Sequence, residues 1–292
     1  MAEKTRARLL AELQGQARNL ITSGEGLSQF TKPAMQDLAA FLKDHARQVR
    51  ILAYVRDPVS YASSMFCQEV KYGRHAFKLP DLRFRRRLEP SLQVFGRDAV
   101  EVVAFDRKAL HDADLFADAA RRMGIDARKM RRSVANESIS AEALALLYFW
   151  NRCPESAMGS RPKMRARHKL ISVLGDAFPG RIRLAPATIA PLLDPADLGW
   201  LQETFGFAFS ATLSQPDLAP QDTDISGEAD LAALRLRALP KLQALARQYG
   251  APTGMDDPDK LVGQIYARLI RRETWKEPLV SILRRFPPFA GL

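Results

Sequence analysis

The spacing of apolar residues predicts alternating helices and strands in the first quarter of the chain. Residues 3–18 and 32–49 place apolar side chains three or four positions apart, as on one face of a helix. Residues 20–22 and 51–55 are short apolar runs beside turn residues, which predict strands. Pro58 is expected to begin a further helix, because proline is favoured at a first helical position. This order predicts a parallel sheet with right-handed crossovers.

The following residues extend this arrangement, and the pattern then becomes helical. Residues 84–95 predict a helix, residues 99–105 a strand, and residues 109–123 a helix that ends at Gly124. The expected elements beyond Gly124 are a helix over 141–151 with Ser140 as its N-cap, a helix over 198–205 between Asp194 and Gly206, and helices over 229–248 and 258–272.

These elements predict an α/β fold, in which helices flank a parallel sheet and a helical region follows towards the C-terminus. Residues 214–228 have the Pro-, Gln- and Asp-rich composition of a linker. We therefore predict an α/β domain over residues 1–213, a linker over 214–228 and a helical tail over 229–292.

Charge adds one constraint to this picture. The 292 residues include 44 Lys and Arg against 33 Asp and Glu, a formal net charge of +11. Such a charge attracts polyanions, although a compositional preference for Arg on solvated faces would give the same value.

The two cysteines and four scattered histidines form no disulfide framework and no metal motif. No secretory core and no apolar run of about 18 residues is present, so we expect a cytoplasmic protein without a transmembrane segment.

The junction between the strand at 51–55 and the helix begun by Pro58 carries the candidate chemistry. Arg56 is expected at the carboxyl end of a parallel strand, facing a helix amino end, where ligands of open α/β sheets bind. Its guanidinium offers a fork of donors suited to phosphate. Ser64 would bring a hydroxyl to the same anion, with Ser63 as its competitor. The alternative is a surface Arg56 that pairs with Asp57 or caps backbone carbonyls.

Arg-Asp-Pro at 56–58 followed by Ser64 resembles the 3′-phosphate-binding motif of sulfotransferases, which use 3′-phosphoadenosine 5′-phosphosulfate (PAPS). Residues 20–25, Leu-Ile-Thr-Ser-Gly-Glu, resemble a strand that ends in Ser-Ser-Glu in the bacterial carbohydrate-type branch. Residues 84–96 are similar to its Tyr-Arg…Phe-Gly segment, and residues 134–138 to a Val-Asn-Glu-Ser turn. The resemblance covers about residues 15–210. It implies a P-loop-like sulfotransferase fold in which Arg56 and Ser64 bind the 3′-phosphate.

One departure from the family pattern concerns the donor's reacting end. Sulfotransferases hold the 5′-phosphosulfate in a Gly-Lys-Thr-Gly-Thr-Thr-like loop before these motifs. Gly24 and Gly26 bracket Glu25 here without an accompanying Lys-Ser or Lys-Thr. By the family's order the loop belongs upstream of Met1, so the chain resembles a sulfotransferase without its first strand–helix unit.

Four further residues are candidates for the reaction that this resemblance implies. Glu25 is the candidate general base, with helix capping or an Arg partner as the alternative. Lys71 and Arg74 are candidates for binding an anionic acceptor or the adenine side of the nucleotide, and Arg86 for binding an acidic glycan or a nucleotide phosphate. The alternative for each is a solvated basic loop or helix face. Residues 136–138 are expected to cap a helix.

The resemblance implies an enzyme that transfers a sulfuryl group from PAPS to a hydroxyl of a carbohydrate or similar small acceptor, leaving 3′-phosphoadenosine 5′-phosphate. Two other classes stay open. One is a catalytically inactive interaction protein with the same fold, for which an exposed sheet edge would favour a homo-oligomer. The other is a basic polyanion-binding module. Nucleic acid is not an expected partner, because the basic stretch at 161–169 has little aromatic interleaving.

Overall fold

The computed structural model of the chain describes residues 3–13, 19–106, 108–129, 139–207, 209, 223–252 and 254–274. The chain groups into two compact units, each assembled from separate stretches of sequence. The first unit comprises Met1–Pro58, Asp81–Arg132 and Leu192–Thr212, and the second comprises Val59–Pro80, Ser133–Pro191 and Leu213–Leu292. This grouping differs from the consecutive division predicted from composition, because the chain passes from one unit to the other several times.

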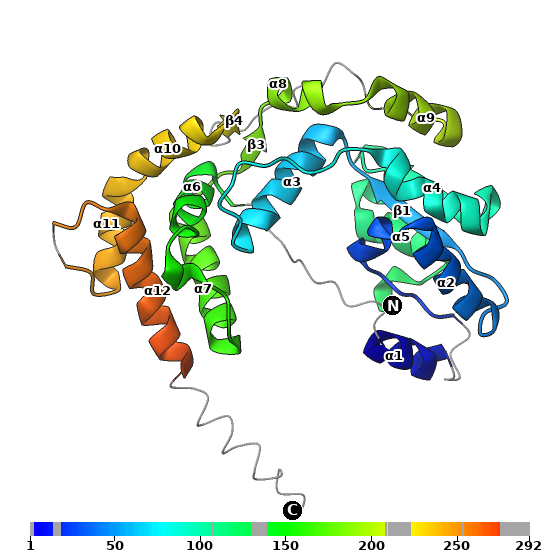
Figure 1. The fold of residues 1–292 in the computed structure, drawn as a ribbon, viewed down its shortest axis with the longest axis horizontal. Coiled ribbons are helices and arrows are strands. Elements are labelled where there is room, and N and C mark those ends of the chain that lie inside the picture. Colours follow the sequence, from blue (N-terminus) through cyan, green and yellow to red (C-terminus); the bar gives the residue numbers. More distant parts are fainter. Residues whose placement is uncertain are drawn as a thin grey trace, which may run out of the picture. The chain divides into compact units, whose positions relative to one another are not determined.

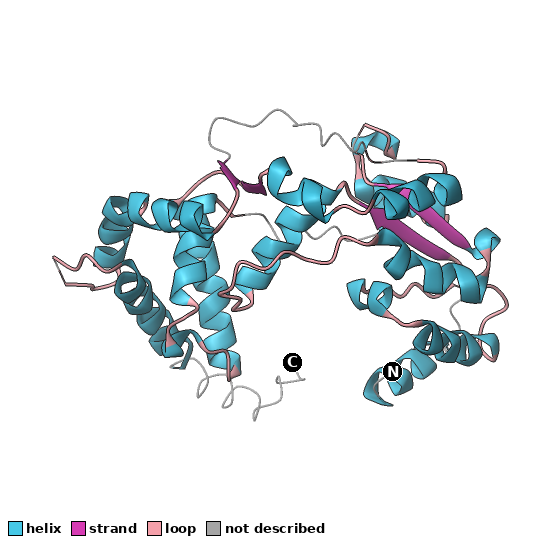
Figure 2. Cartoon of the chain, turned by 45° about the horizontal axis from the view of Figure 1, so that its top comes forward, coloured by secondary structure: helices cyan, strands magenta, loops and turns pink. Residues whose placement is uncertain are grey.

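The first unit contains a two-stranded parallel sheet and its covering helices (Figures 1 and 2). Ile51 lies opposite Val100 and Val55 lies opposite Ala104. The predicted strands at 51–55 and 99–105 and their parallel pairing are therefore confirmed. The helices and strands of this unit are α1 (Glu3–Leu13), α2 (Lys32–Lys43), β1 (Ile51–Val55), α4 (Phe84–Phe95), β2 (Val100–Ala104), α5 (Leu115–Met123) and α9 (Pro195–Phe205).

Helices contact both faces of this sheet. Ala53, Val55 and Val102 pack against a core formed by Phe84 and Leu88 of α4 and Leu201 of α9. Tyr54 points to the opposite face, since successive strand residues alternate, and its hydroxyl donates to Asp118 of α5 at 2.6 Å. The first unit thus has the layered α/β arrangement that the pattern predicted.

The predicted strand at 20–22 is wrong. These residues have no regular secondary structure, and Leu20 and Ile21 are 38% and 52% exposed. In the described residues β1 pairs only with β2, so this short run has no ladder partner to satisfy its backbone. Two apolar residues and a threonine are too few to specify a strand without one.

Two predicted helices of the first unit are shorter than expected. The helix predicted over 32–49 ends at Lys43, and most of the following side chains, such as Asp44 and Arg47, are exposed and polar. The helix predicted over 109–123 begins at Leu115, because Asp112 and Ala113 have positive φ and Asp114 caps the helix by accepting from the Ala117 N–H at 2.9 Å.

The second unit is built around a helix that is buried on all sides. This helix, α6 (Ala141–Trp150), contains Leu144, Leu147 and Trp150 at 1% exposure or less, as expected for a helix with no polar face. The other helices and strands of the unit are α3 (Pro58–Lys71), α7 (Arg161–Ala177), β3 (Ile182–Leu184), α8 (Pro186–Ile189), β4 (Thr223–Ile225), α10 (Glu228–Arg237), α11 (Leu239–Gln248) and α12 (Pro258–Thr274).

Two features of the second unit correct the sequence prediction. Thr223–Ile225, inside the predicted linker, form β4 and pair in parallel with β3. An ion pair between Arg183 of β3 and Asp224 of β4, at 2.6 Å, also joins the two strands. The helix predicted over 229–248 is divided in two at Ala238, because Pro240 lacks the N–H that a continuous helix requires. Glu228, the last residue of the predicted linker, begins α10, and residues 214–222 lie outside the described residues.

Several predicted helix ends are confirmed. The Ser140 hydroxyl accepts from the Ala143 N–H at 3.1 Å at the start of α6. Gly124 and Gly206 end α5 and α9 with φ of 69° and 79°, a left-handed conformation that glycine adopts readily. None of the described helices combines the length and apolar character that a membrane span needs.

Candidate functional site

Arg56 lies at the carboxyl end of β1, as the sequence predicted. Its guanidinium carbon is 4.5 Å from the centre of the Phe105 ring, and Phe105 follows the last residue of β2. The Phe105 N–H donates to the Val55 carbonyl at 2.6 Å, which continues the parallel ladder to this edge. The ends of two neighbouring strands therefore fix the cation and the aromatic ring on which it stacks.

Arg56 is partly buried and has no carboxylate partner among the described residues. A guanidinium that stacks on an aromatic face keeps its N–H edge for other acceptors, because the ring occupies only its flat side. The Phe105 ring also limits the rotamers of a long side chain, which lowers the entropy cost of binding. This arrangement suits a bound phosphate or sulfate.

The structure distinguishes the two candidate serines on α3. The Ser63 hydroxyl donates to the Val59 carbonyl at 2.7 Å and accepts from the Leu184 N–H at 2.9 Å, so it ties α3 to β3. Ser64 is partly buried and makes no such bond within the described part of the chain. Only the Ser63 hydroxyl therefore ties α3 to β3. Arg56 belongs to the first unit and Ser64 to the second.

Glu25 is the first residue of a short 3-10 helix, Glu25–Gln29, that packs against α4. The sequence placed it at the carboxyl edge of the sheet because a strand over 20–22 was expected to lead there. That strand is absent, so this reason for placing Glu25 beside Arg56 no longer holds. The candidate cap at 136–138 lies outside the described residues.

The two basic candidates at the C-terminal end of α3 have structural partners. Lys71 is buried, and its carbonyl accepts from Arg167 Nε at 2.6 Å. Arg74 pairs with Glu69 at 2.8 Å. Burial raises the pKa of the nearby Cys67 thiol, against the opposing effect of the Lys71 ammonium. This thiol is packed in the core and is not a nucleophile.

Arg86 lies in an arginine run in which three guanidinium groups pair with nearby carboxylates. Asp81 accepts from Arg83 at 2.9 Å and from Arg86 at 2.6 Å, and Glu89 accepts from Arg85 at 2.8 Å. Hydrogen bonds from Arg83, followed by those from Arg86, hold the pKa of Asp81 well below its usual range. An acidic acceptor would have to compete with these carboxylates for Arg86.

Sequence reasoning missed a charged network on the α5 face of the sheet. Asp118 accepts from Tyr54 and from Arg122 Nε, both at 2.6 Å, and Arg122 also reaches Glu101 at 2.5 Å. Burial raises the pKa of Asp118, but the hydrogen bonds from Arg122 and Tyr54 outweigh it and lower the pKa to about 2. Burial and Asp118 raise the pKa of Tyr54. The network fastens α5 to β1 and β2. An i,i+4 Asp–Arg pair was its only local signal.

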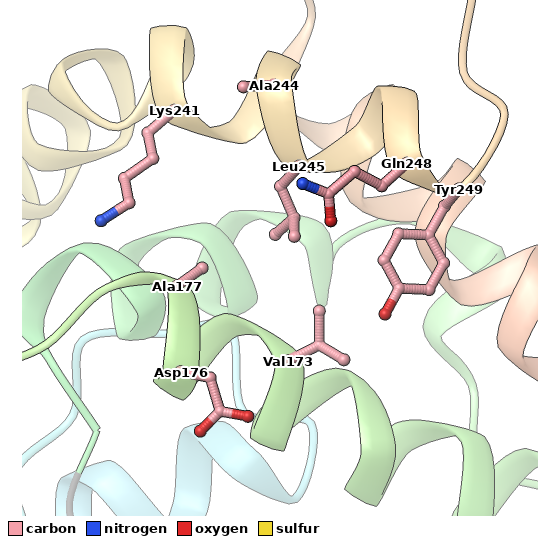
Figure 3. A pocket seen from close by; sticks show the side chains of 8 residues that line it. All are labelled: Val173, Asp176, Ala177, Lys241, Ala244, Leu245, Gln248 and Tyr249. Carbon is pink, nitrogen blue, oxygen red and sulfur yellow. The ribbon is translucent and has the colours of Figure 1, made fainter.

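A groove of about 470 Å³ lies between α7 and α11 in the second unit (Figure 3). Lys241 and Asp176 lie at one end, and Gln248 and Tyr249 at the other. The Lys241 ammonium is 5.4 Å from the centre of the Phe178 ring. The remaining lining residues are Val173, Ala177, Ala244 and Leu245. None of these residues was a candidate from the sequence.

Comparisons with protein-family models, with curated proteins and with solved structures found no match. Within the described residues no three His, Cys, Asp or Glu side chains group as a metal site. Among the described residues, Arg56 and Phe105 form the candidate site at the carboxyl edge of the sheet.

Proposed function

We propose that the chain binds a 3′-phosphorylated adenine nucleotide through Arg56 and transfers the sulfuryl group of PAPS to a hydroxyl of a carbohydrate or similar small acceptor. The observation that carries the proposal is the Arg56 guanidinium, held 4.5 Å from the Phe105 ring at the carboxyl edge of a parallel sheet. Ligands of α/β sheets bind at this edge. The spacing from Arg56 to Ser64 supports the choice of a 3′-phosphate.

Arg56 would bind the 3′-phosphate, a group that distinguishes PAPS from ATP. The resemblance alone assigns the Ser64 hydroxyl to the same group. No residue of this chain is assigned to the 5′-phosphosulfate. The bound nucleotide would supply the sulfuryl group. Glu25 is proposed, from the resemblance alone, to take the proton of the acceptor hydroxyl as the new S–O bond forms and the S–O bond to the donor phosphate breaks.

Calorimetric titration with 3′-phosphoadenosine 5′-phosphate and with AMP tests the nucleotide site. The bisphosphate is expected to bind at least tenfold more tightly than AMP, since a charge-assisted contact contributes about 1.5–3 kcal/mol. Arg56→Ala should remove this preference. Arg50→Ala is the matched control, because Arg50 lies before the other end of β1 and is 59% exposed. Equal binding of both nucleotides by the folded protein would refute the proposal.

Turnover is tested separately from binding. Incubation with PAPS and a panel of carbohydrate and small hydroxyl acceptors should yield sulfated product and 3′-phosphoadenosine 5′-phosphate. Glu25→Gln should lower this rate and leave the nucleotide affinity unchanged, because the carboxylate is assigned only to proton transfer. A Glu25→Gln protein with full activity would exclude Glu25 as the base.

The sheet itself favours a second candidate function, assembly with another chain. Within the described residues β1 and β2 pair only with each other, so each has an outer edge of backbone donors and acceptors. An inactive member of the fold could use that edge to form a homo-oligomer by strand addition. Sedimentation over a hundredfold range of protein concentration tests this. A monomer throughout that range excludes it.

A further inference from the structure

The groove between α7 and α11 is a cavity that the nucleotide site does not use. It has a volume of about 470 Å³, and its lining residues all belong to the second unit (Figure 3). Helix α12 packs against both α7 and α11. Leu174 and Leu242, each next to a lining residue, are 0% exposed. A packed core therefore fixes the walls of the groove, as in preformed sites for small molecules.

The middle of the groove is lined by aliphatic side chains. Val173 on α7 and Leu245 on α11 point toward each other across it, and Ala177 and Ala244 complete the walls (Figure 3). None of the four is fully buried. These side chains offer neither a hydrogen-bond partner nor an aromatic face to a sugar or a nucleotide base. An aliphatic chain suits this part of the groove, because its burial there removes apolar surface from water.

The two ends of the groove are polar and differ from each other. Lys241 extends from α11 at one end, and its ammonium is 5.4 Å from the centre of the Phe178 ring. Within the described residues this ammonium has no carboxylate at ion-pair distance. Gln248 and Tyr249 extend from the other end of α11 toward the groove (Figure 3). The groove therefore offers a cation at one end and hydrogen-bonding groups at the other.

The charges at the Lys241 end favour an anion with a single charge. One ammonium compensates one negative charge, whereas a phosphate group is typically bound by several N–H donors or by an arginine fork. Asp176 lies at the same end and points away from α11 in this view (Figure 3). Its carboxylate repels a dianion more strongly than a monoanion. A carboxylate therefore fits this end better than a phosphate monoester.

The length of the groove indicates the length of the chain that it can hold. Lys241 and Gln248 lie seven residues apart on α11, which corresponds to about 10 Å along the helix axis. With carbon–carbon bonds of about 1.5 Å, an extended chain of about eight carbon atoms spans this distance.

We propose that the groove between α7 and α11 binds a medium-chain aliphatic carboxylate. The carboxylate group lies at Lys241, and the chain lies between Val173 and Leu245. The Gln248 amide and the Tyr249 hydroxyl are placed to hydrogen-bond a polar group at the far end of such a chain. The inference goes beyond the proposed function and does not depend on it, because no residue of α7 or α11 is assigned to the nucleotide.

Calorimetric titration of the full chain with octanoate tests the proposal. We expect saturable binding of one octanoate per chain, with affinity that rises by up to about fourfold for each methylene added from butyrate to octanoate. Octanol has the chain without the charge and should bind more weakly. Lys241→Gln should weaken octanoate binding by about two- to fivefold, as for an exposed ion pair, and leave octanol binding unchanged.

Two further variants separate the groove from general attraction. Arg247→Gln removes an exposed cation of the same helix that does not line the groove, so octanoate affinity should be unchanged. Ala244→Phe adds a ring at an exposed position of the groove wall and should abolish binding.

Four results would overturn the proposal. The first is the absence of octanoate binding to the unmodified chain, and the second is octanol that binds as tightly as octanoate. The third is equal weakening in Arg247→Gln and Lys241→Gln, or full binding by Ala244→Phe. The fourth comes from sedimentation: a dimer of the unmodified chain that Ala244→Phe dissociates would show that a second copy occupies the groove.

Discussion

Arg167 Nε donates to the carbonyl oxygen of Lys71 at 2.6 Å, which joins the middle of α7 to the C-terminus of α3. A second nitrogen of Arg167 donates to the Val70 carbonyl at 3.1 Å and to Asn151 Oδ1 at 2.6 Å. Arg167 is 1% exposed, and its guanidinium lies 5.5 Å from the centre of the Trp150 ring. A cation at a helix C-terminus interacts favourably with the helix dipole and its last carbonyls.

Removing this cap should destabilise the second unit. Arg167→Met leaves the Lys71 carbonyl and Asn151 Oδ1 without this donor in a buried site, so we expect a decrease of roughly 2–5 kcal/mol in the free energy of unfolding. Urea unfolding measures it. Arg161→Met on the same helix is the control, and should change stability by less than about 0.5 kcal/mol because Arg161 is exposed. Similar effects of the two substitutions would contradict the capping role.

The two serines of α3 should separate stability from binding. Ser63→Ala removes the acceptor of the buried Leu184 N–H and should cost about 1–3 kcal/mol of unfolding free energy, with nucleotide affinity unchanged. Ser64→Ala should leave stability unchanged and weaken binding of 3′-phosphoadenosine 5′-phosphate. Urea unfolding and calorimetry on both variants give the comparison. A Ser64→Ala protein with full affinity would remove Ser64 from the site.

Phe105 is expected to affect nucleotide affinity through Arg56. Phe105→Leu keeps an apolar side chain but removes the aromatic face, and a cation–π contact contributes about 0.5–1 kcal/mol. We therefore expect calorimetry to show affinity for 3′-phosphoadenosine 5′-phosphate that is weaker by about two- to fivefold.

Phe205→Leu is the matched control for Phe105, because the Phe205 ring lies 5.0 Å from the Arg97 guanidinium in the same unit. It removes an equivalent stacking contact at a position to which no ligand role is assigned. If both substitutions weaken binding equally, the effect comes from the fold and not from Arg56.

Asp118 should make stability depend on pH in the acid range. Its pKa in the folded protein, about 2, lies below the unfolded value of 3.8. The folded state therefore favours the carboxylate, and this stabilisation is present above pH 4 and is lost as the pH falls from 4 to 2. It amounts to about 2 kcal/mol. Unfolding free energies of the unmodified chain and of Asp118→Asn should differ most near pH 6 and converge towards pH 2. A difference that stays constant with pH would contradict this.

Local sequence determined the elements whose information lies within a few residues. The strand at 51–55 and the helix at 84–95 have the predicted bounds, because an unbroken apolar run before a charged turn and an i,i+4 apolar face are patterns that lie within the segment itself. The caps at Ser140, Gly124 and Gly206 were also predictable, since each satisfies backbone groups of its own helix end. Arg56 could be placed at a strand end because it directly follows the apolar run at 51–55.

Tertiary structure decided everything that depends on a partner distant in sequence. The run at 20–22 has strand-like residues but no neighbour to pair with, whereas polar Thr223–Ile225 becomes a strand because β3 lies beside it. Phe105 as the partner of Arg56, and Glu273 between Arg165 and Lys169, follow from strand pairing and helix packing. Residue spacing encodes local periodicity, but which elements meet depends on burying apolar surface and satisfying backbone groups across the whole chain.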